Sequence, residues 1–292
     1  MSALNIQQNL ATAGDAMKVA MQRMATGSKI NQASDDAAGM AVSTNFETQI
    51  SGQKVAQQNA QLGSNLLTTT EGTVGVVQKN VQRIRDLIEQ ASNGTYDQKA
   101  KTAIRTEIAS RTAEVSRLND SANFNGIRLF GDTGTTGTGT VGVKLQVGDG
   151  ADATTNAITI DKSVFASVNV STMAGTTSAF SQTNLDTFLG SADGSTAATS
   201  TDASTLLKAC DNALSSLVSK KTSIGAYQNR LTSAVDGLKV SQLNLASANS
   251  TIKDSDIAEE SASYVKNQIL QQASASLLAQ ANQAPSIAIN LI

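Results

Sequence analysis

The chain has 292 residues, of which 3% are aromatic and none is tryptophan or histidine. So few aromatic side chains argue against one large close-packed core, and favour long helices that pack through small residues. Without histidine the commonest general base and metal ligand are missing, so we expect neither an enzyme nor a cofactor. The formal net charge is -2 with no long Lys/Arg block, which argues against nucleic acid and membranes as partners.

Both ends of the chain are almost free of charge and follow a helical repeat. Residues 1–14 and 267–292 contain no Asp, Glu, Lys or Arg. Apolar residues near the N-terminus lie seven, four and three apart, at Leu10, Met17, Met21 and Met24. Those near the C-terminus form a similar stripe, at Ile269, Leu270, Leu277 and Leu278. Glutamines break every apolar run that could cross a bilayer. We expect both helices to be buried against protein, either against each other in one core or in an assembly.

Three helices are predicted before the middle of the chain. The first covers residues 4–31, and capping oxygens at residues 34–36 precede a second over residues 45–92. An Asn-Gly pair ends the second helix, and Asp97 can cap a third that covers residues 98–119. Because the connection is short, the second and third helices should lie antiparallel.

A hairpin and an irregular segment follow. Residues 131–142 form a Gly/Thr-rich linker that lacks the Gly-Lys-Ser/Thr ending of a phosphate loop. Apolar residues alternate over 141–147 and again at Ile158 and Ile160, which predicts a β-hairpin. Residues 171–202 are rich in Ser, Thr, Gly and Ala, and should be irregular and exposed.

Helical pattern resumes near residue 203. Five large aliphatic residues lie seven apart over four heptads, which is specific to coiled coils: Leu217, Ile224, Leu231, Leu238 and Leu245. Cys210 falls on an apolar position and should be buried rather than nucleophilic. Asp256 and Glu259 have the capping-box spacing that starts the last helix.

Two groups of charged residues have both a structural and a functional interpretation. The acidic pairs could be metal or acid/base sites, but each lies at a predicted helix start, where capping is the ordinary role. They are Asp35 with Asp36 and Asp254 with Asp256. Arg83 and Leu87 lie four apart on one helical face, and Glu114 on the next helix could approach them. By spacing alone, this face is either solvated or a binding surface.

Five motifs resemble those of the bacterial flagellins, the subunits of the flagellar filament. The resemblance covers residues 1–130 and 205–292, and the order of the motifs at both ends makes it specific. The motifs are Ala25-Thr26-Gly27-Ser28-Lys29-Ile30-Asn31, Asp35-Asp36-Ala37-Ala38-Gly39, Phe124-Asn125-Gly126, Ile269-Leu270-Gln271-Gln272-Ala273 and Leu278-Ala279-Gln280-Ala281-Asn282-Gln283.

The resemblance implies a mainly α, elongated fold with long antiparallel helices, a terminal coiled coil and a small β-hairpin region in the middle. Residues 1–40 and 251–292 would form the coiled-coil domain of the filament core. Residues 41–170 and 203–250 would form a rod-like helical domain that includes the hairpin. Residues 171–202 would take the place of a variable outer domain.

The resemblance also implies partners and a location. The chain would be exported through the flagellar type III apparatus and polymerise with itself into the extracellular filament. An export chaperone would cover its C-terminal helix, and filament cap and hook-junction proteins would meet the filament ends. Subunit and coiled-coil contacts are expected at Leu10, Met17, Met21, Ile269, Leu277 and Leu278.

Similar flagellins are recognised by the vertebrate Toll-like flagellin receptor. The matching face here contains Arg83, Leu87 and Glu114, so receptor recognition is a hypothesis for this chain. Two alternatives to a filament subunit stay open on sequence alone: a hook-filament junction protein, and a secreted adhesin or receptor ligand.

Overall fold

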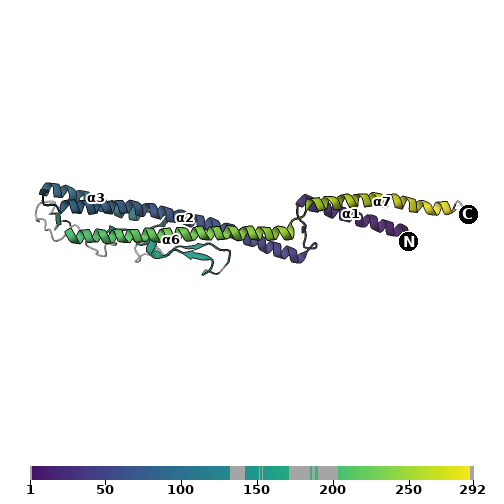
Figure 1. Ribbon diagram of the computed structural model, residues 1–292, viewed down its shortest axis with the longest axis horizontal. Coiled ribbons are helices and arrows are strands. Elements are labelled where there is room, and N and C mark those ends of the chain that lie inside the picture. The colour runs from purple at the N-terminus through teal and green to yellow at the C-terminus, as the bar shows by residue number, and fades with distance from the viewer. Residues whose placement is uncertain are drawn as a thin grey trace. The chain divides into compact units, whose positions relative to one another are not determined.

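The computed structural model describes residues 2–131, 142–150, 152, 154–170, 185, 188–189 and 203–289, with side chains from residue 4 to residue 281 within these ranges. Five long helices dominate this part of the chain, as Figure 1 shows: α1 (Ser2–Thr26), α2 (Ala37–Ala91), α3 (Gln98–Ser121), α6 (Ala203–Lys253) and α7 (Ile257–Ile289). The predicted mainly α fold is confirmed. No helix of the described residues is long and apolar enough to span a membrane.

The chain forms two compact units, each built from segments that are distant in sequence. The smaller unit combines Met1–Gly52 with Lys239–Ile292, and the larger unit is Gln53–Leu238. The boundaries therefore fall inside α2 and α6, whereas the sequence suggested a division at residues 40 and 251. The two units are described separately below.

Local hydrogen bonds set where the first two helices end and begin. Gly27 has a φ of 67°, which favours glycine, and its N–H donates to the Arg23 carbonyl at 2.8 Å. For this reason α1 ends before the predicted residue 31. The Asp36 carboxylate accepts from the Gly39 N–H at 2.9 Å, so α2 begins at Ala37, eight residues before the predicted start.

Ion pairs and hydrogen bonds show that neighbouring helices of the larger unit run antiparallel. Two arginines connect α2 and α3. Arg83 of α2 contacts Glu107 of α3 at 3.1 Å, and Arg111 of α3 donates to Asn80 Oδ1 of α2 at 3.3 Å. The predicted antiparallel pair is therefore confirmed. The α2–α6 contact is antiparallel as well, with Arg85–Asp211 at 2.8 Å and Gln228–Glu71 at 3.2 Å. The Asp97 cap of α3 is also confirmed, since its side chain accepts from the Ala100 N–H at 2.9 Å.

The heptad repeat of α6 faces the core of the larger unit. Leu217, Ile224 and Leu231 are almost completely buried, as predicted. They join a continuous core with bulky residues of α2 and α3, among them Leu67, Ile84, Ile88 and Ile108. Cys210 is fully buried, and this burial raises the pKa of its thiol to about 12, so it is an unreactive core residue.

Two small antiparallel hairpins accompany the helices. The predicted hairpin is confirmed as β3 (Lys144–Gln146) paired with β4 (Ala157–Thr159), with Leu145 opposite Ile158. Val141 lies outside the described residues. A second hairpin, β1 (Asn123–Phe124) with β2 (Ile127–Arg128), was not predicted. Its turn contains Asn125 at φ 51° and Gly126 at φ 80°, which is the backbone of a tight hairpin turn.

The segment predicted to be irregular and exposed is described at three residues only. Leu185, Phe188 and Leu189 are buried in the larger core, and the Leu189 carbonyl accepts from Gln98 Nε2 at 2.9 Å. At these positions the expected exposure is wrong. Apolar side chains spaced three and four residues apart lie on one side of a helical turn, and burying them against the long helices is favourable. The rest of residues 171–202 lies outside the described residues. A short 3-10 helix, η1 (Lys162–Phe165), precedes this segment and contributes Phe165 to the core.

The β3–β4 hairpin packs on α2 at a glycine. A Cβ placed on Gly63 would lie 2.2 Å from Leu145 Cδ1, and Asn59 Nδ2 donates to the Gln146 carbonyl at 3.2 Å. A larger residue at 63 would therefore push β3 away from α2.

We predict that Gly63→Leu lowers the free energy of unfolding by about 1–3 kcal/mol, because the added side chain overpacks the contact with Leu145. Denaturant unfolding followed by circular dichroism measures the change. Gly75→Leu is the matched control, because no atom lies within 4 Å of a Cβ at this α2 position. It should stabilise the helix by up to about 1 kcal/mol. Equal effects at both positions would contradict the hairpin contact.

Candidate assembly site

The two terminal helices, α1 and α7, lie side by side and antiparallel in the smaller unit (Figure 1). Near one end of the pair, Arg23 Nη1 contacts Glu260 Oε1 at 3.2 Å, and Ser261 Oγ donates to Met24 Sδ at 3.3 Å. Further along, a Cβ on Gly14 would lie 3.7 Å from Gln271 Nε2. The end of α1 therefore lies beside the start of α7.

The seam between these helices has the spacing of a coiled coil but little apolar bulk. Buried and half-buried positions alternate by four and three residues on both helices. They are Ile6, Leu10, Ala13, Met17, Ala20 and Met24 on α1, and Glu260, Tyr264, Asn267, Gln271, Ser274 and Leu278 on α7. The predicted terminal coiled coil is thus confirmed. Among the described side chains of this pair, the only buried apolar ones are Ala13 and Ala20.

The six predicted contact residues divide between the seam and the outside. Leu10, Met17 and Leu278 are half-buried at seam positions. Met21, Ile269 and Leu277 are 49%, 60% and 52% exposed and lie outside the seam. The first three contact the other helix within the subunit, and the second three are the more exposed to another molecule.

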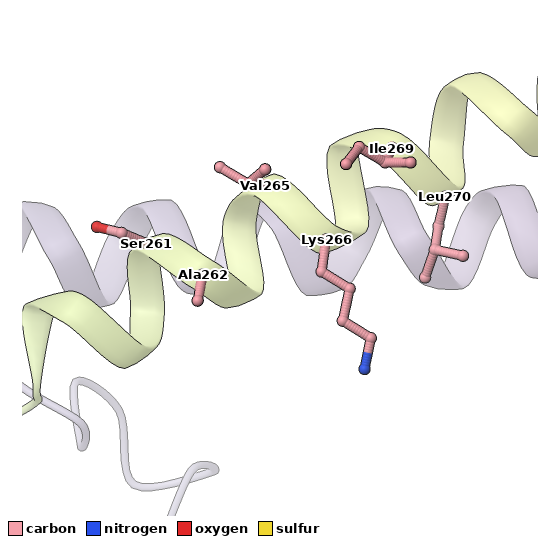
Figure 2. Close-up of a pocket in the computed structure, with 6 residues that line it drawn as sticks. All are labelled: Ser261, Ala262, Val265, Lys266, Ile269 and Leu270. Carbon is pink, nitrogen blue, oxygen red and sulfur yellow. The ribbon is translucent and has the colours of Figure 1, made fainter.

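Val265, Ile269 and Leu270 form an exposed apolar strip on α7, shown in Figure 2. Ser261, Val265 and Ile269 form one row, and Ala262, Lys266 and Leu270 form a second row beside it; together the six residues line a shallow open depression. Val265, Ile269 and Leu270 are each at least 45% exposed. Rows of side chains four residues apart leave the kind of groove into which a ridge of a second helix packs.

The connections beside this helix pair are held by backbone hydrogen bonds. The Lys29 N–H donates to the Lys253 carbonyl at 2.6 Å, and the Ser255 N–H donates to the Gly27 carbonyl at 3.0 Å. Lys253 Nζ also contacts Glu47 Oε1 at 2.6 Å, and this contact lowers the pKa of Glu47. The α1–α2 connection is therefore fixed to the α6–α7 connection.

The acidic pairs have mainly structural roles at these connections. Asp35 accepts the N–H groups of Asn31 and Gln32, both at 3.0 Å, and these bonds lower its pKa. Asp256 accepts from the Ala258 N–H at 2.8 Å and so starts α7. With the Asp36 bond described above, the capping interpretation is confirmed for Asp36 and Asp256. Asp254 instead accepts from Ser250 Oγ at 2.6 Å.

Comparison with known proteins gives the family. Residues 1–135 match a family model described as the bacterial flagellin N-terminal helical region, and residues 207–292 match the bacterial flagellin C-terminal helical region. The chain is also 33% identical, over its whole length, to a flagellin of Bacillus subtilis, of which it covers 97%. The chain belongs to the bacterial flagellin family. Flagellins are structural subunits of the flagellar filament, so the role of this chain is structural.

Further relatives agree with this assignment. A flagellar filament 30.7 kDa core protein of Treponema maltophilum is 34% identical over 97% of the chain and 94% of its own length. A flagellin of Treponema pallidum is 32% identical over 100% of the chain and 98% of its own length. A solved structure of a flagellar hook-associated protein from Vibrio parahaemolyticus has a TM-score of 0.63, covering 75% of this chain and all of that one. Its 16% identity shows a shared fold only.

The predicted receptor face of this flagellin is only partly exposed. The side chains of Arg83 and Glu114 are 46% and 42% exposed, whereas Leu87 is 1% exposed and packs in the core. Leu87 therefore cannot touch a partner directly, which corrects its expected place on this face. The physical reason is that Leu87 shares the core-facing side of α2 with Ile84 and Ile88.

Arg83 and Glu114 do not pair with each other, although the sequence suggested that Glu114 could approach Arg83. Arg83 binds Glu107, which accepts Arg111 Nε at 3.0 Å as well, and the two guanidinium groups lower the pKa of Glu107. Glu114 is held by Arg117, with contacts of 2.6 and 2.7 Å, and this pair lowers the pKa of Glu114. The sequence did not reveal Glu107 and Arg111, although their spacing of four on α3 could have indicated an ion pair.

Lys220 is a buried charged residue of the larger unit. It is 9% exposed, and its ammonium donates to the carbonyl oxygens of Ser163 at 2.6 Å and Ala166 at 3.0 Å. Burial lowers its pKa to about 8. These bonds satisfy carbonyl groups at the end of η1, so Lys220 anchors this turn to α6. No cluster of His, Cys, Asp and Glu in the described part of the chain could hold a metal ion.

Proposed function

We propose that this flagellin polymerises into the flagellar filament through the outward faces of its terminal helices. The exposed apolar strip of α7, with Val265, Ile269 and Leu270, carries this proposal. Complete burial of one such side chain contributes about 1.5–3 kcal/mol. Several of them together offset the loss of translational and rotational freedom that association of each subunit costs.

The seam supports the same proposal. Asn267, Gln271 and Ser274 occupy positions that apolar residues fill in a stable two-stranded coil. The α1–α7 pair therefore gains little from its own contact, and covering α7 from outside adds the missing burial. Contacts between different faces of identical subunits need not close into a ring, which is what an extending filament requires.

Further parts of the proposal concern location and partners. The chain would leave the cell through the flagellar type III export apparatus and function in the extracellular filament. Before export, a chaperone would cover the apolar strip of α7, because such a strip left free favours premature association. Filament cap and hook-junction proteins would contact the polymer at its ends.

We predict that Ile269→Asp and Leu277→Asp each abolish or strongly slow filament growth, because an aspartate in a dry interface leaves a charge without hydration. Elongation of fluorescent filament seeds by purified monomer, viewed by electron microscopy, measures this effect. Ile127→Asp is the control, since Ile127 is a similarly exposed residue at 50%, on β2. It should leave growth near the wild-type rate.

Normal growth by the two α7 variants would contradict the proposed interface. Short rings from the wild-type chain, instead of long fibres, would favour a hook-filament junction protein. Monomers that never elongate would favour an adhesin or receptor ligand.

A second proposed function is recognition by the vertebrate Toll-like flagellin receptor. Arg83 on α2 and Glu114 on α3 support it, because both are exposed and belong to helices that the Arg83–Glu107 pair links. The contribution of Leu87 would be indirect, through packing that holds Arg83 in place.

We predict that Arg83→Ala and Glu114→Ala monomers are each about tenfold less potent in a receptor-signalling assay, which corresponds to about 1.4 kcal/mol of binding. Lys99→Ala, at an exposed position near the start of α3, is the control and should signal as the wild type does. If all three variants signal as potently as the wild type, Arg83 and Glu114 do not form a receptor site.

A further inference from the structure

A cavity between η1 and α6 of the larger unit has a buried cation in its wall. The cavity has a volume of about 360 Å³. Its lining consists of Ser163, Val164, Ser215, Ser216, Ser219, Lys220 and Ser223. Among these residues Lys220 is the only charged one, and five of the others carry a hydroxyl group. The cavity therefore combines one positive charge with several small polar groups.

The ammonium group of Lys220 lacks a counter-charge. Two of its three N–H groups donate to the carbonyl oxygens of Ser163 and Ala166. In the part of the chain that the structure describes, its third N–H has no protein acceptor and no carboxylate forms an ion pair with it. Buried charges in proteins are ordinarily paired, because burial of a single ion is costly. Lys220 thus leaves a positive charge and one donor unused at the wall of the cavity.

The hydroxyl groups that α6 contributes to the lining are unused as well. Hydroxyl groups on helices commonly donate to the carbonyl four residues earlier, as that of Thr222 does at 3.0 Å. The four α6 serines of the lining make no hydrogen bond to any other described residue through their side chains. Ser216 lies four residues before Lys220 and Ser223 three residues after it, so the three share one face of α6. Free hydroxyl donors therefore gather on both sides of the buried ammonium.

The charges close to this cavity in sequence favour a negative ligand. Residues 161–166 and 215–223 contain three lysines and one acidic residue, Asp161. The Asp161 carboxylate caps η1, where it accepts the Ser163 N–H at 2.7 Å, and this bond lowers its pKa. An excess of positive charge around a concave site raises the local concentration of anions.

We propose that this cavity binds a tetrahedral oxyanion of the phosphate type through the Lys220 ammonium and the serine hydroxyl groups of α6. The anion pairs with the buried cation, and charge-assisted hydrogen bonds from the free donors hold its oxygens. Phosphate suits this arrangement because its oxygens point in four directions, whereas the donors come from successive turns of α6. Pockets for small molecules begin at about 300 Å³, so the cavity also has room for a short organic group on the phosphate.

Titration of the purified full-length monomer with inorganic phosphate tests the site. Calorimetry at an ionic strength held constant with sodium chloride should show one saturable site per chain. Lys220→Met removes the charge, and the double variant Ser216→Ala, Ser223→Ala removes two hydroxyl groups but keeps the charge. Each should bind phosphate about tenfold more weakly than the wild type, because hydrogen bonds to a charged group are lost.

Lys221→Met is the matched control. It removes the same charge from the neighbouring residue, which does not belong to the lining. Its affinity should stay within about twofold of that of the wild type, because a charge outside the cavity is screened by solvent. If Lys220→Met does not fold, the double serine variant decides the outcome, since its core and its charges are unchanged.

Two results would overturn the proposal. The first is the absence of saturable binding to the wild type. The second is an equal affinity of all variants, which would mean an adventitious ion only. Glycerol phosphate in the same titration distinguishes the source of the group: tighter binding than inorganic phosphate supports an organic phosphate as the ligand, and equal or weaker binding supports the free ion.

Discussion

The polar seam between α1 and α7 is the helix contact on which the smaller unit of this flagellin depends. Its central positions on α7 hold Asn267, Gln271 and Ser274, and the buried apolar side chains of α1 are Ala13 and Ala20. Polar residues at seam positions fix the register of two helices at a cost in stability. The register of the pair is thus well specified, while its seam buries little apolar surface of its own.

The two units differ in how many bulky apolar side chains they bury. The larger unit buries bulky residues such as Leu67, Ile84, Ile108 and Phe130 in one continuous core, which supports independent folding. The smaller unit buries three apolar residues among its described side chains, Ala13, Ala20 and Ile30. Its Ile269 and Leu277 are exposed, and in the proposed polymer a second subunit covers them.

Helix periodicity and capping were the parts of this structure that sequence could predict. The repeat of Leu217, Ile224 and Leu231 correctly indicated a buried helix face, and Asp97 correctly indicated a helix start. α2 begins earlier than predicted because the Asp36 side chain accepts the Gly39 N–H and so caps the helix before residue 45. The β1–β2 hairpin was missed because strands of two residues have no periodicity to detect.

The assembly site was harder to predict than the helices. Leu277 and Leu278 are adjacent apolar residues, yet the first is exposed and the second is half-buried in the seam. Periodicity alone places both on an apolar stripe, because it cannot tell a face covered within the subunit from one covered between subunits. The resemblance placed Leu87 on the receptor face, whereas its position beside Ile84 and Ile88 shows that it belongs to the core.

Removal of residues 267–292 tests most directly whether the terminal helix serves assembly rather than folding. Seeded elongation and denaturant unfolding of the truncated chain would be measured side by side. The account predicts that elongation is abolished, while the cooperative unfolding of α2, α3 and α6 stays within about 1 kcal/mol of the intact monomer. Filaments from the truncated chain, or loss of cooperative unfolding, would contradict it.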